Sequence, residues 1–305
     1  MYVSMAHILR HAAENHYAVI AANALNMEMA RGIISAADET GSPLIIIIGP
    51  GAMANHATPE LMAPMIRTLA EGTSSPIALC LDHGKDINNV ARVLYNRYSS
   101  VMIDTSTLPM EENIAYTKRV VDLCHPLGVG VEGELGHVGQ AANNDGQDDS
   151  LFTRPEDAAR FARETGVDCL AVAIGTAHGK YPKGFVPKIN FDLLREIKAA
   201  TNNMPIALHG GSGSGDENIL KAVEAGINKI NLATDLQEAS RIAFTEKSNA
   251  GAGYLECIQA AEQGCKKLLM HWMNLAGCCG RAADFKMPYR FDTLQGDIKN
   301  TVKGE

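Results

Sequence analysis

The sequence predicts an α/β fold of the (β/α)8 TIM-barrel type with one added C-terminal helix. Short apolar runs alternate with segments of helical periodicity along almost the whole chain. The runs are apolar at nearly every position, as expected for parallel strands that are covered on both faces. Eight such units in one unbroken series are typical of a closed barrel. A doubly wound open sheet is the alternative, because periodicity alone does not demonstrate closure.

The individual elements follow from these patterns in chain order. The apolar runs predict strands at 18–22, 44–48, 77–81, 101–103, 129–131, 169–174, 206–208 and 229–232. Helical spacing of apolar residues predicts helices at 28–40, 59–71, 88–96, 111–127, 155–165, 191–201, 216–225 and 235–244, with a further helix at 254–275.

Two polar, glycine-containing segments, 140–150 and 175–188, each follow the end of a strand, and we expect loops on the same face of the barrel. The first of them is expected to be mobile. Residues 286–305 are polar without a clear period, which predicts a tail after a barrel domain that spans 1–285.

Composition excludes several classes of protein. A formal charge of -8 argues against a nucleic-acid-binding surface. No apolar run is long enough to span a membrane, and the N-terminus lacks a basic and apolar signal region. We therefore expect a cytoplasmic enzyme with no membrane partner. The seven cysteines are scattered, which predicts neither a disulfide framework nor a cysteine zinc site.

Three histidines, His83, His178 and His209, each follow an apolar run and precede a glycine. Active sites of TIM barrels lie at the C-terminal ends of the strands, where these residues are expected to meet. Three imidazoles with an open fourth position are a catalytic metal site. The alternative is a set of hydrogen-bonded histidines without metal. Because neighbours on a strand point to opposite faces, the backbone must twist near His83, and Gly84 permits that.

Carboxylates follow three of the predicted strands. Asp82 precedes the first histidine and is the best candidate for a general acid or base. Glu134 can approach the same metal or an alternate position, or else form a salt bridge in the mouth. Asp104 can orient a histidine ligand from behind, or simply cap a turn with Thr105 or Ser106.

A glycine-rich loop at 210–215 precedes a helix, so its backbone N–H groups can converge on an anion. It is followed by Asn231 and Thr234 after the eighth strand. TIM barrels build phosphate sites from their seventh and eighth loops, which favours a phosphorylated ligand.

Six motifs follow one another along the chain: LDHG at 81–84, VMID at 101–104, VEGELG at 131–136, AVAIGTAHGKY at 171–181, LHGGSG at 208–213 and KINLATD at 229–235. Taken together, they resemble those of class II, metal-dependent ketose-phosphate aldolases over about residues 3–283. The pairing of the fourth and sixth motifs is closer to the tagatose-bisphosphate branch than to typical fructose-bisphosphate members.

The resemblance implies a cytoplasmic lyase that cleaves a small phosphorylated sugar to dihydroxyacetone phosphate and an aldehyde. It implies one catalytic Zn²⁺ on the three histidines, with Asp104 and Glu134 near that ion or an alternate cation site. Asp82 would move the proton at the hydroxyl beside the cleaved bond. Carbonyls near Ala177 and Gly210 would bind a monovalent cation, Na⁺ or K⁺. The substrate site would include Asn23 and the phosphate-binding residues Gly179, Gly210, Gly211, Ser212, Asn231 and Thr234. We expect a homodimer or homotetramer.

The sequence departs from this family at three places. Ala142 stands where relatives carry a glutamate, so Asp145, Asp148, Asp149 or water would have to protonate the enediolate. Gly49 replaces a hydroxyl residue near the phosphate. The segment 249–254 lacks the arginine that binds a distal phosphate in bisphosphate-cleaving relatives, which predicts a distal end that is unphosphorylated or held differently.

Three other functions stay open on the sequence. A Schiff-base aldolase would need a reactive lysine in a strand, and Lys229 is the candidate, although a salt bridge at the bottom of the barrel fits it better. A zinc-dependent hydrolase could use the same histidines and aspartate. A catalytically silent partner subunit of an aldolase is the third, and the intact histidines and Asp82 argue against it.

Overall fold

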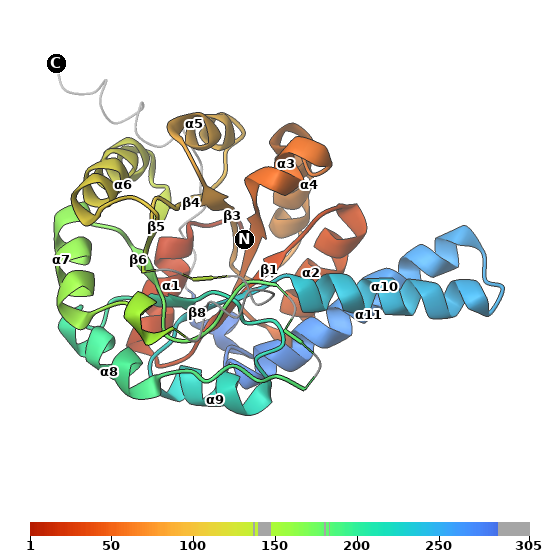
Figure 1. Ribbon diagram of the computed structural model, residues 1–305. Coiled ribbons are helices and arrows are strands. Elements are labelled where there is room, and N and C mark those ends of the chain that lie inside the picture. The colour runs from red at the N-terminus through yellow and green to blue at the C-terminus, as the bar shows by residue number, and fades with distance from the viewer. Residues whose placement is uncertain (137, 140–147, 180, 183, 286–305) are drawn as a thin grey trace, which may run out of the picture.

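The computed structural model describes residues 1–136, 138–139, 148–179, 181–182 and 184–285. These residues form a closed barrel of eight parallel strands in sequential order, surrounded by helices (Figure 1). The predicted TIM barrel is therefore confirmed, and the open doubly wound sheet is excluded. The strands are β1 (Val19–Asn23), β2 (Leu44–Ile48), β3 (Ile77–Gly84), β4 (Ser100–Ile103), β5 (Gly130–Leu135), β6 (Cys169–Val172), β7 (Ile206–Leu208) and β8 (Lys229–Leu232).

Most of the helices surround the barrel (Figure 1). The α-helices are α1 (Met5–Glu14), α2 (Met27–Thr40), α3 (Pro50–Asn55), α4 (Pro59–Glu71), α5 (Ile87–Tyr95), α6 (Met110–Cys124), α7 (Pro155–Thr165), α8 (Phe191–Ala200), α9 (Asp216–Glu224), α10 (Thr234–Asn249) and α11 (Tyr254–Leu275). Three short 3₁₀ turns, η1 (His125–Leu127), η4 (Asp149–Leu151) and η5 (Arg281–Asp284), complete the described structure.

The helix ends follow from local chemistry. Asn26 and Asp86 precede α2 and α5, and their side chains accept hydrogen bonds from the backbone N–H of Met29 and Asn89. Such caps satisfy N–H groups that have no partner within the helix. At the other end of α2, Gly41 takes a left-handed conformation with φ 61°, which ends the helix at little steric cost.

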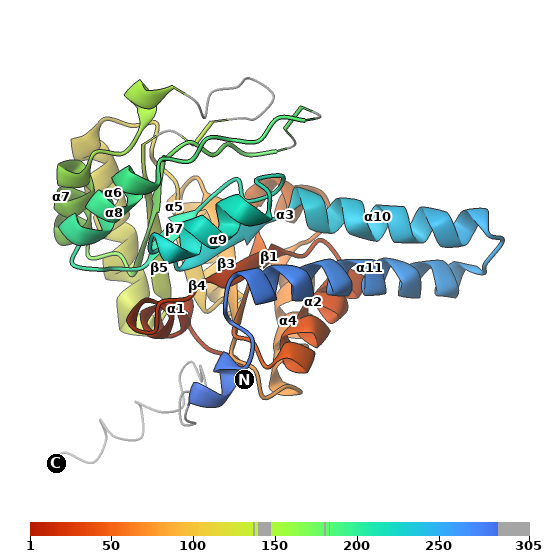
Figure 2. The same cartoon turned by 90° about the horizontal axis from the view of Figure 1, so that it is seen from below.

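Two helices project from the barrel as a hairpin. Helix α10 runs away from the barrel, and α11 returns along it to pack against α2 (Figure 2). Gly264 of α11 permits this close approach, because a Cβ there would lie 2.7 Å from the Ala239 carbonyl oxygen of α10. The short segment between the two helices forms the tip of the hairpin.

The structure changes several of the predicted elements. The predicted strands at 77–81 and 129–131 are longer in the structure, so that Asp82, His83 and two glutamates lie within β3 and β5. Helices α1 and α3 were not predicted. None of the helices in the described ranges combines the length and the apolar character that crossing a bilayer requires. The predicted tail at 286–305 lies outside the described residues.

Candidate metal centre and active site

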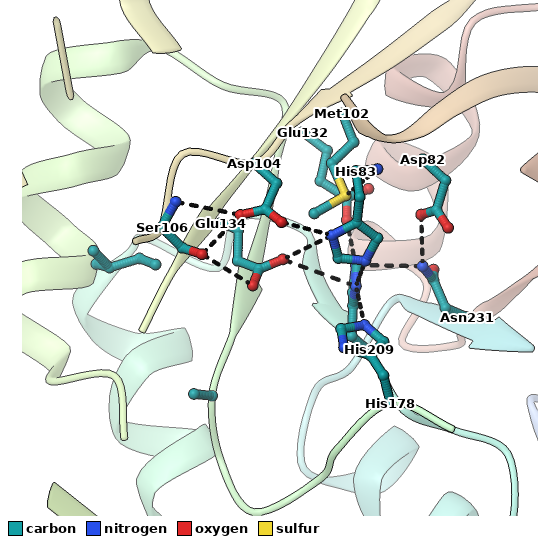
Figure 3. Close-up of polar contacts among 12 residues, drawn as sticks. Asp82, His83, Met102, Asp104, Ser106, Glu132, Glu134, His178, His209 and Asn231 are labelled. Carbon is teal, nitrogen blue, oxygen red and sulfur yellow. Dashed lines mark hydrogen bonds and ion pairs between the residues drawn. The ribbon is translucent and has the colours of Figure 1, made fainter. Parts of the chain in front are cut away.

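Three imidazoles from distant parts of the chain meet at the C-terminal ends of the strands (Figure 3). His209 Nδ1 lies 3.0 Å from His83 Nε2 and 3.3 Å from His178 Nε2. All three ligand atoms lie within 4.8 Å of one another. Nitrogens on one tetrahedral Zn²⁺, each about 2.0–2.1 Å from the ion, would be separated by roughly 3.3 Å. The spacing of the cluster therefore fits a single divalent ion, and its occupation by metal stays a prediction.

The backbone at His83 explains how it reaches this cluster. His83 has φ 48°, and the pairing of β3 with β4 shifts register between Leu81 and Gly84. A bulge of this kind lets Asp82 and His83 both turn toward the site. The expected twist is present, and its left-handed residue is His83 itself. Gly84 is needed for space instead, since a Cβ there would lie 2.8 Å from the Met102 carbonyl oxygen.

Carboxylates lie behind two of the imidazoles. Asp104 Oδ2 lies 2.9 Å from His83 Nδ1, and Glu132 Oε1 lies 2.8 Å from His209 Nε2. These contacts fix each ring so that the opposite nitrogen faces the cluster, as carboxylates do behind metal-bound histidines. Asp104 also accepts hydrogen bonds from Ser106 through Oδ1. It therefore makes both of the contacts that the sequence left as alternatives.

Glu132 is a further site residue, and local sequence patterns predict no particular role for it. Its side chain is fully buried between His209 and Lys229, whose Nζ lies 2.8 Å from Glu132 Oε2. Burial opposes ionisation, but Lys229 and His209 outweigh it and lower the pKa of Glu132 to about 2. The predicted strand ended one residue before Glu132, so only its position beside the barrel mouth signalled a function.

Glu134 offers a buried oxygen that a cation would satisfy. Glu134 Oε2 has no hydrogen-bond partner among the described residues, and it lies 3.6 Å from His83 Nδ1 and 4.0 Å from His209 Nδ1. Burial, with help from Asp104 and Glu132, raises the pKa of Glu134 to about 8. Together with His83 and Asp104 it forms a second group of potential metal ligands.

The imidazoles differ in their charge. Burial and the two neighbouring imidazoles lower the pKa of His178 to about 3, and burial also lowers that of His209. At His83, burial is outweighed by Asp82, Asp104 and Glu134, which raise the pKa to about 9. A divalent ion would have to replace that proton, since metal-bound imidazole is neutral.

Asp82 lies at the edge of the histidine cluster and is half-buried. Asn231 Nδ2 donates to Asp82 Oδ1 at 3.1 Å, and Asn231 also approaches His209 Nε2 at 3.4 Å. Asn23, another predicted substrate-site residue, is buried, donates to the Ile47 carbonyl and accepts from Gln237. Of the two Asp82 carboxylate oxygens, only Oδ1 has a hydrogen-bond partner among the described residues, whereas both polar atoms of the Asn23 side chain are engaged.

The glycine-rich loop after β7 packs closely against its surroundings. Gly210 has φ 68°, and a Cβ there would lie 2.3 Å from the Ala177 carbonyl oxygen. A Cβ at Gly211 would lie 2.7 Å from the Asn231 carbonyl oxygen. The structure thus brings the seventh and eighth loops together, and Ser212 Oγ accepts from the backbone N–H of Asp235 in the first turn of α10.

Two other predicted phosphate residues border the same loops. Thr234 is the first residue of α10. Gly179 has φ 97° and open space where a Cβ would be, so the structure gives it no packing reason to be glycine. The carbonyl oxygens of Ala177 and Gly210 accept hydrogen bonds from Tyr181 and Ser214, respectively.

Some predicted residues lie elsewhere. Ala142 and Asp145 fall outside the described residues. Asp148 is an exposed residue that caps η4, and the exposed Asp149 is the first residue of that turn. Gly49 precedes α3 as its N-terminal cap.

Comparison with known proteins establishes the class of this protein. A family model described as fructose-bisphosphate aldolase class-II matches residues 3–281. The chain belongs to this family, and it is an enzyme of the lyase class. The resemblance and the enzyme class that the sequence predicted are confirmed.

Particular relatives support the same assignment. The uncharacterized protein YdjI of Escherichia coli K12 is 36% identical over 275 residues, covering 89% of this chain and 96% of that protein. The crystal structure of the YdjI aldolase matches with TM-score 0.83 and 34% identity, over 92% of this chain and 100% of that one. A putative fructose-1,6-bisphosphate aldolase from Coccidioides immitis matches with TM-score 0.78 and 27% identity, over 91% and 97% of the two chains.

Proposed function

We propose that this chain is a zinc-dependent class II aldolase that reversibly cleaves a ketose 1-phosphate or 1,6-bisphosphate of the tagatose or fructose type. The products would be dihydroxyacetone phosphate and an aldehyde such as glyceraldehyde 3-phosphate. The observation that carries the proposal is the cluster of three imidazole nitrogens beside Asp82, with a carboxylate behind two of the rings.

The donor set supports zinc. His83, His178 and His209 would hold the ion, and three neutral imidazoles with an open fourth position are the ligands of many catalytic zinc sites. When bound, such an ion supplies Lewis acidity toward the oxygen atoms of a ketose. Glu134, whose buried oxygen lacks a hydrogen bond among the described residues, is suited to compensate part of the cation's charge.

Asp82 is the proposed base. Its carboxylate would take the proton from the C4 hydroxyl as the C3–C4 bond breaks, releasing the aldehyde. The remaining three-carbon enediolate must then gain a proton at C3 to become dihydroxyacetone phosphate. Asn231 supports this role, because its amide N–H holds Asp82 Oδ1 and so leaves the other carboxylate oxygen to face the substrate.

The phosphate of the substrate is proposed to bind at the glycine-rich loop and the N-terminus of α10. Gly179, Gly210, Gly211, Ser212, Asn231 and Thr234 are the proposed contacts. Backbone N–H groups at a helix start favour an anion, and they would fix the reacting carbons in line with Asp82. A monovalent cation, Na⁺ or K⁺, is proposed at the carbonyls of Ala177 and Gly210.

The state of the distal end of the sugar is a separate proposal. The segment without the expected arginine lies at the tip of the α10–α11 hairpin, which projects away from the barrel (Figure 2). Within one chain, this segment does not border the site. A missing arginine there bears on the substrate only if the tip reaches the site of a second copy. An unphosphorylated distal end therefore rests on the sequence comparison alone.

A substrate panel tests the function directly. Ketose 1-phosphates and 1,6-bisphosphates of fructose and tagatose are incubated with the zinc-loaded protein, and dihydroxyacetone phosphate is measured. We expect release from at least one sugar and its loss on treatment with EDTA, with recovery on adding Zn²⁺. Equal rates on 1-phosphates and 1,6-bisphosphates would contradict an unphosphorylated distal end.

The same experiment separates the alternatives. Inactivation by borohydride in the presence of substrate, with no effect of EDTA, would indicate a Schiff-base aldolase. Release of inorganic phosphate without cleavage of the carbon chain would indicate a hydrolase. No turnover of any sugar by the zinc-loaded chain would favour the silent partner subunit.

A further inference from the structure

A fully buried lysine lies behind the candidate site. Lys229 is the first residue of β8 and has no exposed surface. The sequence suggested a salt bridge at the bottom of the barrel, and the salt bridge is present. Its ammonium, however, reaches toward the mouth, where it lies 2.8 Å from Glu132 Oε2 and 2.7 Å from Asn231 Oδ1. Lys229 therefore contacts two residues that themselves touch the site.

The contacts of Lys229 continue to both halves of the site. On one side, Glu132 Oε1 lies 2.8 Å from His209 Nε2, so that His209 Nδ1 faces the other imidazoles. On the other side, Asn231 Nδ2 donates to Asp82 Oδ1 at 3.1 Å. Lys229 is thus linked to the proposed metal ligand His209 through Glu132. It is linked to the proposed base Asp82 through Asn231.

Lys229 determines which way the Asn231 amide points. An ammonium only donates hydrogen bonds, so the atom of Asn231 that faces Lys229 must be the carbonyl oxygen Oδ1. The amide N–H group is then directed at Asp82, a carboxylate that can only accept when ionised. Without the ammonium, the carbonyl oxygen of Asn231 would lose its donor, and the orientation of the amide would depend on the Asp82 contact without the support of Lys229.

Lys229 also keeps Glu132 charged. A carboxylate without exposed surface is stable as an anion only when paired, and Lys229 is the cation that pairs with it. Because ionised Glu132 can only accept, His209 must donate Nε2–H to it, which fixes the tautomer that leaves Nδ1 free of a proton.

We propose that Lys229 is a positioning residue that aligns the metal-binding face of His209 and the amide of Asn231 at the same time. This inference rests on the proposed function. It also excludes Lys229 as a Schiff-base nucleophile, because its pairing with Glu132 keeps the amine protonated. Lys229 acts through Glu132 and Asn231 and contacts no substrate atom.

The test uses three variants of the full-length chain. K229M removes the ammonium at similar length, and K229M/E132Q removes both charges, so that no unpaired charge stays buried. K198M is the matched control. Lys198 is a second buried lysine, whose ammonium lies 2.6 Å from Asn228 Oδ1 and bonds the Met204 carbonyl, away from the histidine cluster.

Three quantities are measured for each variant: the melting temperature, the retention of Zn²⁺ against a chelator, and kcat and KM on the sugar that the panel identifies. We expect the melting temperature of K229M/E132Q to lie closer to that of the wild type than the melting temperature of K229M does. Its kcat should nevertheless be at least 10-fold below the wild-type value, with KM within threefold of it. It should also lose Zn²⁺ to chelator at least 10-fold more readily. K198M should change the melting temperature but neither kcat nor zinc retention by more than twofold.

Two results would overturn the inference. If K229M/E132Q regains both kcat and zinc retention along with its melting temperature, Lys229 only balances charge. If K198M matches the defects of K229M/E132Q, loss of any buried lysine suffices. Should K229M fail to fold, the double variant still gives both readouts. Zinc retention is measured without turnover. It therefore tests the role of Lys229 even if the proposed aldolase function is wrong.

Discussion

At the scale of single residues, the histidines of the candidate site can be predicted from the sequence, but the residues that contact them from behind cannot. A histidine before a glycine at the end of an apolar run marks His83, His178 and His209 without any knowledge of the fold. The pairing of Glu132 with Lys229 depends instead on how β5 and β8 face each other across the barrel. Such a contact between distant residues is set by closure and strand register, which local patterns do not contain.

Asp82 is the residue whose replacement tests the chemistry most simply. D82N preserves size and the contact with Asn231 but cannot accept a proton. We expect kcat to fall by about 10²-fold or more, the usual contribution of a positioned general acid or base. The measurement is the initial rate of dihydroxyacetone phosphate release, with bound zinc determined on the same sample.

Zinc content close to that of the wild type is the control for an intact metal site in D82N. A kcat within threefold of the wild type would show that Asp82 does not move the proton.

At the scale of elements, the sequence placed the strands and most helices correctly but misjudged their ends. The predicted strands at 77–81 and 129–131 stop where polar residues begin, because hydropathy cannot distinguish a charged residue inside a barrel mouth from one in a loop. β3 and β5 continue through Asp82 and Glu134, whose side chains face the site, where Asp82 contacts Asn231 and Glu134 lies near His83. Helix α10 likewise extends to Asn249 because α11 packs along it.

The packing of α11 against α2 depends on a glycine. A Cβ at Gly32 would lie 2.6 Å from the Glu262 carbonyl oxygen, and neither backbone can move without displacing a helix. Overpacking of this kind typically costs about 1–3 kcal/mol. We therefore expect G32A to lower the free energy of unfolding, measured by denaturant titration.

Gly51 in α3 is the matched control, because a Cβ there would meet nothing within 4 Å. G51A is expected to be neutral or stabilising by up to about 1 kcal/mol, as alanine favours helix more than glycine does. Equal stability of G32A and G51A would contradict the account of the α2–α11 contact.

At the scale of the whole molecule, closure of the barrel is what turns separate strand ends into one site. The order of the eight strands follows the sequence, so each loop lies beside its neighbours in the chain. Eight repeated units predict this arrangement well. The projecting α10–α11 hairpin (Figure 1) could not be predicted in this way, because its helices are indistinguishable by pattern from helices that cover a barrel.

The hairpin carries exposed apolar side chains on which the expected oligomer could form. Ile242, Tyr254 and Leu255 are apolar side chains of α10 and α11 that are 43%, 77% and 65% exposed. We expect a homodimer or homotetramer in which these residues are covered by a second copy. Light scattering on the purified protein should give a mass two or four times that of the chain.

A double substitution tests that surface. Y254S/L255S should shift the mass toward a single chain, whereas L61S, which changes the 71%-exposed Leu61 of α4, should not. A monomeric wild type, or an unchanged mass of Y254S/L255S, would contradict this assignment of the contact.

The central claim is that imidazoles from β3 and from the loops after β6 and β7 hold one divalent ion together. Anomalous diffraction at the zinc absorption edge, from crystals grown with ZnCl₂, tests it most directly. The account predicts one strong peak bounded by His83 Nε2, His178 Nε2 and His209 Nδ1. A peak away from these three nitrogens, or none in crystals of folded protein, would contradict it.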